Sequence, residues 1–344
     1  MSTAKFSVVN VFSTTPYKGN PLAVVDDLSA SLSTTQMQLI TRQFNLSETT
    51  FVNPPTVPGA AFRLRSFLPD GKEVFGAGHN SLGALWWLAK HGHLADIPPS
   101  STSGTSTTTE FNQEMASTAM PVTVSQDSSA NQLKVTLRQA PPKFHGVHPS
   151  PSKLAQLLGI PESSIGFEWG PEKRHVAKAQ VVSTATTRHL LVPLADVSVL
   201  NSVCSLDREK MLTEIQAADK LAYGLFLFAP ESHDAASDGK LPVFQARFFS
   251  PGMSGEDPAT GSAAGPMGAY LHKYGVFDLN GKDQDLTVLQ GTRVGRACYL
   301  TITVGLLQDQ DGVGERESVS TYVTGDGVEV LSGNLVVPAV ETEF

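Results

Sequence analysis

An internal repeat constrains the fold of this chain more than any other feature of its sequence. Two short motifs occur once in each half, in the same order and at nearly the same spacing. The matched residues are Arg65, Phe67 and Pro69 with Arg247, Phe249 and Pro251 and, after a slip of one residue, Gly78, Leu88, Lys90 and Gly92 with Gly261, Leu271, Lys273 and Gly275. Each copy has the pattern of a strand, a glycine-containing turn and a helix. The repeat therefore predicts two similar halves, with function in a cleft between them.

The composition indicates a soluble chain whose partner is a small molecule. Its 344 residues, 40% of them hydrophobic, are enough for two substantial cores. The net charge is −8 and Lys and Arg form no runs, so nucleic acid and anionic membranes are not expected partners. No apolar stretch reaches the ~18 residues of a membrane span, and the first residues have a strand pattern without a signal-peptide layout, so we expect a cytoplasmic protein.

Hydrophobic periodicity predicts two helices in the first half. Ser33 and Gln36 form a capping-box pattern, and the apolar residues that follow share one helical face, so we expect a helix that ends near Asn45. The stretch from His79 to His91 is too apolar for a surface helix and contains small residues such as Gly83. It is therefore expected to be a core helix wrapped by sheet.

Composition also indicates where the halves divide. Residues 98–117 are rich in Ser, Thr and Pro and almost lack large apolar residues, which predicts an exposed connecting loop. We therefore place the first half at residues 1–120 and the second at residues 121–329. Alternating apolar patterns outnumber helical ones across the chain, which predicts an α+β fold with a mixed or antiparallel sheet.

Glu48 is the charged residue of the segment LSETTFV, residues 46–52, for which we expect a short strand. Two interpretations of this carboxylate stay open. Glutamate is mostly a surface residue, so it can be an exposed strand side chain. It can also be a general base whose pKa is raised by apolar surroundings.

The two repeated turns are stronger candidates for function. Gly78 and His79 begin one expected helix, while Asp257, Gly261 and Ser262 surround the start of the other. Amides at a helix N-terminus bind anions, and glycines let a ligand approach them closely, so the two turns could hold two ends of an acidic substrate. The structural alternatives are a glycine turn with an incidental histidine and an aspartate that caps its own turn. The duplication favours the functional interpretation.

Three other kinds of site fit the sequence less well. A dinucleotide fingerprint would need glycine at the position of Ser81. The histidine pairs have no acidic or cysteine partner at metal-ligand spacing, so no metal site is expected. Ser262 has no nearby histidine in the sequence and no G-x-S-x-G elbow, which disfavours a serine hydrolase.

Five blocks of sequence together resemble the phenazine-biosynthesis PhzF-like family of isomerases, which shares the diaminopimelate epimerase fold. The blocks are KGNPLAVV (18–25), LSETTFV (46–52), GAGHNSLGA (76–84), EDPATGSAAG (256–265) and QGTRVGR (290–296). The resemblance implies two pseudo-symmetric halves, each a sheet curled around one central helix, with a final strand at about 330–344 that returns to the first half. It also implies a homodimer that uses no metal or organic cofactor.

The same resemblance assigns roles to individual residues. Its implied catalytic groups are Glu48, His79 and Asp257, and its implied substrate-binding positions are Asn20, Ser47, Gly78, Gly261 and Ser262. The sequence departs from the family pattern at Asn80 and Ser81, where Pro-Thr is usual, and at Cys298, where serine is common. These departures bear on the identity of the substrate more than on the type of reaction.

The sequence thus predicts a cofactor-independent isomerase that acts on a small carboxylate-bearing molecule. Glu48 would remove a proton from carbon and return it elsewhere, while His79 and Asp257 position the substrate and exchange protons. Two alternatives stay open: an epimerase or racemase of an amino or hydroxy acid that works without thiols, and a non-catalytic homologue that binds a small ligand. Racemisation by two thiols is disfavoured, because Cys204 and Cys298 lie outside both turns.

Overall fold

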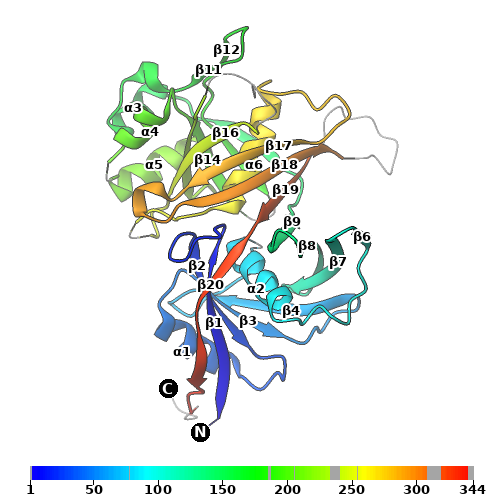
Figure 1. Ribbon diagram of the computed structural model, residues 1–344. Coiled ribbons are helices and arrows are strands. Elements are labelled where there is room, and N and C mark those ends of the chain that lie inside the picture. The colour runs from blue at the N-terminus through cyan, green and yellow to red at the C-terminus, as the bar shows by residue number, and fades with distance from the viewer. Residues whose placement is uncertain are drawn as a thin grey trace. The chain divides into compact units, whose positions relative to one another are not determined.

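The chain folds into two compact units (Figure 1). Unit one comprises residues 1–138 and 324–344, and unit two comprises residues 139–323. The computed structural model describes residues 2–76, 78–184, 187–204, 206–232, 241–253, 255–307 and 319–339. Residues 340–344 of the expected final strand (330–344) lie outside this range, and residues 330–336 of it belong to β20 (Gly327–Val336).

Unit one is built on a mixed sheet. Its strands are β1 (Thr3–Val11), β2 (Asn20–Asp26), β3 (Thr49–Asn53), β4 (Ala60–Phe67), β5 (Glu73–Val74), β6 (Ser101–Ser103), β7 (Ser106–Met115), β8 (Thr118–Asp127), β9 (Gln132–Arg138) and β20. They lie in the order β20, β1, β2, β3, β4, β7, β8, β9, with β2–β3 and β4–β7 parallel and the other pairs antiparallel. The short strands β5 and β6 pair with β4 and β7.

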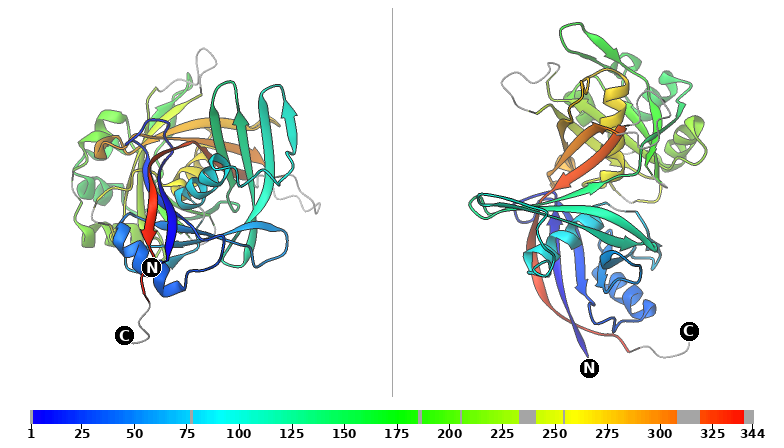
Figure 2. Two further views of the ribbon diagram at one scale, coloured as in Figure 1. Left: turned by 60° about the horizontal axis from the view of Figure 1, so that its bottom comes forward. Right: turned by 90° about the vertical axis from the view of Figure 1, so that its right-hand side faces the viewer.

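Helix α2 (His79–Lys90) forms the centre of unit one, as the sequence predicted. It contacts β20 and β9, the two ends of the strand order, so the sheet curls around the helix (Figures 1 and 2). Every residue from 79 to 89 is buried. Gly83 makes this close packing feasible, because a Cβ there would lie 2.6 Å from Val11 Cγ2 and 2.7 Å from Leu22 Cδ2.

Helix α1 (Thr34–Phe44) also forms where the sequence predicted it. The Ser33 hydroxyl accepts from the Gln36 amide, and the Gln36 side chain accepts from the Ser33 amide, which completes the capping box. Asn45 ends the helix in the left-handed conformation, with φ of 50°. Met37 and Ile40 pack in a cluster with Phe51 and Phe67, so this helix covers the face of the sheet opposite α2.

The prediction of an exposed loop over residues 98–117 is wrong. That segment contains β6 and β7, and β7 pairs with both β4 and β8. A composition rich in Ser and Thr is typical of loops, yet β-branched threonine also fits a strand with solvated faces. The boundary expected near residue 120 falls inside β8, and all of β8 and β9 belong to unit one, although residues from 121 on were expected in the second half.

Unit two has a second mixed sheet. Its strands are β10 (Lys143–Val147), β13 (Gln180–Thr184), β14 (Thr187–Pro193), β15 (Gly224–Pro230), β16 (Val243–Phe249), β17 (Gln284–Gln290) and β18 (Cys298–Leu306), which pair in that order. A hairpin of β11 (Phe167–Trp169) and β12 (Arg174–Val176) stands apart from it. The chain returns to unit one within β19 (Val319–Gly325).

Helices lie on both faces of the unit-two sheet. Helix α6 (Gly261–Lys273) contacts β13, β14 and β18, and its first eleven residues are almost all buried. The other face carries α3 (Pro151–Leu158), α4 (Val197–Ser202) and α5 (Arg208–Ala218), whose apolar side chains form one cluster with β13, β14 and β15 (Figure 1). Unit two therefore also has one central helix with a sheet around it, and the predicted α+β fold of two similar halves is confirmed.

The sequence repeat is also a repeat of contacts. Arg65 and Arg247 each donate two hydrogen bonds to one glutamate, Glu73 and Glu256 respectively. Each guanidinium also lies over the phenylalanine two residues later, 5.2 Å from the ring centre in unit one and 5.0 Å in unit two. The repeated arginine therefore ties β4 in unit one and β16 in unit two to the glutamate that follows each strand in the chain.

Candidate active site

The candidate catalytic carboxylate of unit one lies beside a histidine. Glu48 is the last residue before β3, outside the strand in which it was expected. Its Oε2 atom lies 3.4 Å from Nδ1 of His79, the first residue of α2. The Ser47 hydroxyl oxygen lies 3.5 Å from the other ring nitrogen, Nε2. Unit one therefore brings together three of the predicted site residues, and the two chain neighbours Ser47 and Glu48 face the two nitrogens of one ring.

The environment of His79 keeps its ring neutral. The side chain is 9% exposed, and burial lowers the pKa of His79 to about 4, so desolvation outweighs the attraction of the nearby carboxylate. Glu48 remains 21% exposed and can reach a small molecule from solvent. A neutral imidazole with a proton on Nδ1 can donate to Glu48 and accept at Nε2, which is an arrangement suited to proton transfer.

The Gly78 amide in the turn before α2 was expected to bind an anion, but in the structure it bonds within the turn itself. That N–H donates to the Asn80 side-chain oxygen at 2.9 Å, and the Asn80 amide nitrogen donates to the Gly76 carbonyl at 3.0 Å. The Asn80 side chain thus stabilises the turn by accepting from the backbone amide of Gly78, which the sequence assigns to substrate binding. The helix leaves the amides of His79 and the next two residues outside its own hydrogen-bond ladder.

Asn20 is positioned by a glycine turn. Gly19 has φ of 78°, and a Cβ there would lie 2.6 Å from the Val11 carbonyl oxygen, so this turn requires glycine. Asn20 follows as the first residue of β2 and is buried. Three residues further along β2, Ala23 pairs with Thr49, the residue after Glu48. Asn20 therefore lies on the strand next to the one that Glu48 precedes.

The candidate carboxylate of unit two is held in a hydrogen-bonded turn. Asp257 Oδ2 accepts from the Thr260 hydroxyl at 2.6 Å. The buried Gln290 side chain donates to the Asp257 carbonyl at 2.7 Å and accepts from the Thr260 amide at 3.1 Å. Gln290 thus fastens both ends of the turn, which gives the block QGTRVGR a physical role as the support of EDPATGS.

Gly291 and Gly295 offer a matched test of that support. Both have positive φ, 79° and 72°, but a Cβ at Gly291 would lie 2.7 Å from the Pro258 carbonyl oxygen, whereas a Cβ at Gly295 meets nothing within 4 Å. We expect Gly295→Ala to lower the free energy of unfolding by about 1 kcal/mol through backbone strain alone. Gly291→Ala should cost about 2–4 kcal/mol, because overpacking is added. Urea unfolding of the two variants measures the difference, and equal losses would contradict this account.

The start of α6 contains a contact that sequence reasoning missed. Gly261 and Ser262 are the first two residues of the helix, so their amides lie outside its hydrogen-bond ladder. The Gly261 carbonyl accepts from the Gln139 side chain at 2.8 Å. The Ser262 hydroxyl lies 3.1 Å from Nε2 of His189 on β14. His189 and Ser262 are far apart in the chain, so no local sequence signal could have predicted their contact.

The two cysteines do not form a pair of catalytic thiols. Both are free, with Cys204 exposed and Cys298 buried. Burial and the nearby charge of Asp257 raise the pKa of the Cys298 thiol, so it stays protonated. Neither cysteine lies in the turns that carry the predicted site residues, which is consistent with chemistry that does not use two thiolates.

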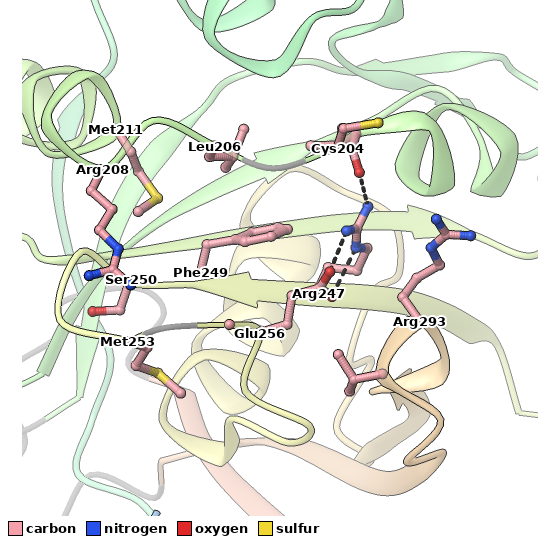
Figure 3. Close-up of a pocket in the computed structure, with 13 residues that line it drawn as sticks. Cys204, Leu206, Arg208, Met211, Arg247, Phe249, Ser250, Met253, Glu256 and Arg293 are labelled. Carbon is pink, nitrogen blue, oxygen red and sulfur yellow. Dashed lines mark hydrogen bonds and ion pairs between the residues drawn. The ribbon is translucent and has the colours of Figure 1, made fainter.

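A pocket in unit two is lined by residues other than the predicted site residues, although the lining residue Glu256 directly precedes Asp257 in the chain. It encloses about 490 Å³ beside α5, β16 and the loop after β16. Figure 3 shows Arg208 and Arg293 on its two sides and the ion pair of Arg247 and Glu256 in its wall. None of the eight predicted site residues lines it, so we do not assign the reaction to this pocket.

Two further properties of the described residues bear on function. Their His, Cys, Asp and Glu side chains form no group of three that could bind a metal ion. Within the same residues, the helices are too short or too polar to cross a bilayer.

Known proteins resemble this chain over nearly its whole length. A model of the family described as phenazine biosynthesis-like protein matches residues 9–333, a range that contains all eight predicted site residues. The chain is 31% identical to an uncharacterized isomerase of Pasteurella multocida over 338 residues, which cover 98% of this chain and 96% of that protein. It is 28% identical to the trans-2,3-dihydro-3-hydroxyanthranilate isomerase of Pseudomonas chlororaphis over 335 residues, with 96% and 99% covered.

Solved structures show the same fold. The phenazine biosynthesis protein of the PhzF family from Bacillus anthracis superposes with a TM-score of 0.74 at 24% identity, covering 98% of this chain and 100% of that chain. A predicted epimerase from Pseudomonas aeruginosa gives a TM-score of 0.68 at 25% identity, with 97% and 100% covered. The similarity in structure therefore extends over both units.

Proposed function

Because the chain belongs to the phenazine biosynthesis-like (PhzF) family of isomerases, we propose that it moves a proton within a small carboxylate-bearing metabolite, with Glu48 as the general acid and base. The observation that supports this role most directly is the pairing of Glu48 with the neutral imidazole of His79 at 3.4 Å. A carboxylate that is partly exposed and held beside a neutral donor can accept a proton from carbon. Family membership, which the sequence resemblance predicted, supplies the reaction class.

In the proposed reaction Glu48 removes a proton from one carbon and delivers a proton to another. The electron pair left by the first proton shifts the double bond of the substrate, and the carboxylate regenerated at the end completes the cycle without a cofactor. His79 donates from Nδ1 to Glu48 and keeps that side chain oriented. Because the ring stays neutral in the neutral pH range, it does not compete with Glu48 for the proton in transit.

We propose a substrate-binding role for the groups of unit two. The amides of Gly261 and Ser262 and the Ser262 hydroxyl are donors at a helix start, where a carboxylate or a developing negative charge is stabilised. Asp257, fixed by Thr260 and Gln290, is proposed to hold or exchange a proton on a polar substituent of a substrate. Asn20 and Ser47 complete the proposed set of substrate-binding groups.

The relatives suggest a first substrate to test. Several are named trans-2,3-dihydro-3-hydroxyanthranilate isomerase, at 27–28% identity. That molecule carries a carboxylate and an amino group, which agrees with the proposed donors. Related cyclic amino acids with a ring double bond form the second set of candidates.

Incubation with trans-2,3-dihydro-3-hydroxyanthranilate in deuterated water tests the reaction. We expect a double-bond isomer that contains solvent deuterium at the newly protonated carbon, measured by NMR and mass spectrometry. A product of inverted configuration with an unmoved double bond would instead support an epimerase. Saturable binding of every candidate acid without isotope exchange would contradict catalysis and support a binding homologue.

A further inference from the structure

The buried His189 stands behind Ser262 in unit two. Its Nε2 atom lies 3.1 Å from the Ser262 hydroxyl oxygen, which is hydrogen-bond distance. The histidine is 1% exposed, whereas Ser262 is only partly buried. Ser262 thus has one side toward the histidine and another that remains accessible to a ligand.

Apolar groups enclose the opposite edge of the His189 ring. The rings of Tyr223 and Phe248 stand edge-on to it, with centres 5.2 Å and 5.0 Å away. Gly224 packs so closely that a Cβ there would collide with His189 Nδ1 and lie 2.5 Å from Phe248. Among the described residues, Nδ1 has no hydrogen-bond partner.

Burial also determines the charge of this ring. It lowers the pKa of His189 to about 3, so the imidazole is neutral near pH 7 and carries a single proton. If that proton were on Nδ1, a buried donor would lack an acceptor, which is strongly unfavourable. A proton on Nε2 instead has the Ser262 oxygen as its acceptor, and only a lone pair is left in the apolar enclosure.

We infer that His189 is a positioning residue that holds Ser262 as a hydrogen-bond donor toward the negatively charged oxygen of the substrate. With Nε2–H donating to the hydroxyl oxygen, the hydroxyl proton is free to point away from the histidine, toward the accessible side. The same tautomer leaves no lone pair facing Ser262, so His189 is not a base that could make this serine a nucleophile. The inference rests on the proposed function, because it takes Ser262 as a substrate-binding residue.

Two substitutions separate positioning from simple packing. His189→Gln places its amide nitrogen near the position of Nε2 and keeps a donor to Ser262, whereas His189→Phe keeps a ring of similar size and removes the donor. A hydrogen bond to a charged group contributes about 1.5–3 kcal/mol, or roughly 10- to 100-fold. We expect His189→Phe to lower kcat/KM by about 10-fold, mainly through KM, and His189→Gln to recover most of that loss.

A double-variant cycle links the effect to the serine. In a Ser262→Ala background, His189→Phe should lower kcat/KM by less than 2-fold further, because the hydroxyl that it orients is absent. An undiminished further loss, or wild-type kcat/KM in His189→Phe alone, would overturn the inference while leaving the isomerase activity of the wild-type protein intact. Unchanged kcat/KM in Ser262→Ala would overturn it as well.

The tautomer is measurable without any substrate. Two-bond ¹H–¹⁵N correlation spectra of ¹⁵N-histidine-labelled protein distinguish Nε2–H from Nδ1–H, and His189→Phe identifies the signal by its loss among the 9 histidines. We expect the Nε2–H form at pH 7, and an Nδ1–H form would overturn the inference. Because this readout needs no turnover, it decides the point even if the wild-type protein proves to have no isomerase activity.

Discussion

Glu48→Gln is expected to lower turnover of the isomerised substrate by about 10²- to 10⁴-fold, the usual contribution of positioned acid–base catalysis. Glutamine keeps the size of the side chain and can still accept from His79, but it cannot take a proton from carbon. Rates of isomerisation and of deuterium incorporation, measured on the same samples, check both halves of the proton transfer. Both rates should fall together, because one carboxylate serves both steps.

Glu110→Gln is a suitable control for this experiment. Glu110 is another glutamate of unit one, but it is exposed on β7 and has no proposed role. Its substitution changes the net charge by the same amount and should leave turnover within 2-fold of wild type. If Glu48→Gln retained the wild-type rate on a substrate that the wild-type protein converts, the assignment of the catalytic base would be wrong.

Arg247→Leu is expected to destabilise the protein by about 3–5 kcal/mol, because it leaves the Glu256 carboxylate, whose side chain is only 13% exposed, without its cation. The Arg247 side chain is 5% exposed, and besides Glu256 it donates to the carbonyls of Leu200 and Val203 at 2.8 and 2.7 Å. Removing it also leaves these two carbonyls without that donor. Denaturant unfolding at pH 7 measures the loss of stability.

The repeat provides the matched control for this variant. Arg65 makes the same two-bond pair with Glu73 and the same contact with a phenylalanine, but it is 16% exposed and Glu73 is 24% exposed. Because solvent weakens the pair, Arg65→Leu should cost only about 1–2 kcal/mol. Adding Glu256→Leu to Arg247→Leu should recover part of the loss by removing the unpaired charge. Equal costs at the two arginines would refute the role of burial.

The features that sequence predicted well are those fixed by local chemistry. The capping box at Ser33 and the left-handed Asn45 set both ends of α1, and the apolar run from His79 identified the central helix. The repeat predicted the second central helix, because both copies share the same arginine and glycine positions. The motifs also named Glu48 and His79 as site residues, and the structure places their side chains 3.4 Å apart, while their catalytic roles stay predictions.

The features that sequence missed depend on long-range pairing. Residues 101–115 looked like a loop because polar composition does not reveal that β4 supplies a partner strand for β7. The Asn80 side chain accepts a hydrogen bond from the Gly78 amide because of the geometry of the turn. The presence of Asn80 in place of the usual proline did not by itself predict this contact. His189 lies far from Ser262 in the chain, and only the packing of β14 beside α6 shows their contact.

The pairing of β1 with both β2 and β20 has a consequence for synthesis on the ribosome. Strand β1 is synthesised long before β20, so the edge of β1 that pairs with β20 stays unpaired for about 15–65 seconds at ~5–20 residues per second. Unit two is one continuous stretch of chain and can fold during that interval. The nascent protein is therefore most exposed to aggregation through the open edge of β1, where a chaperone would protect it best.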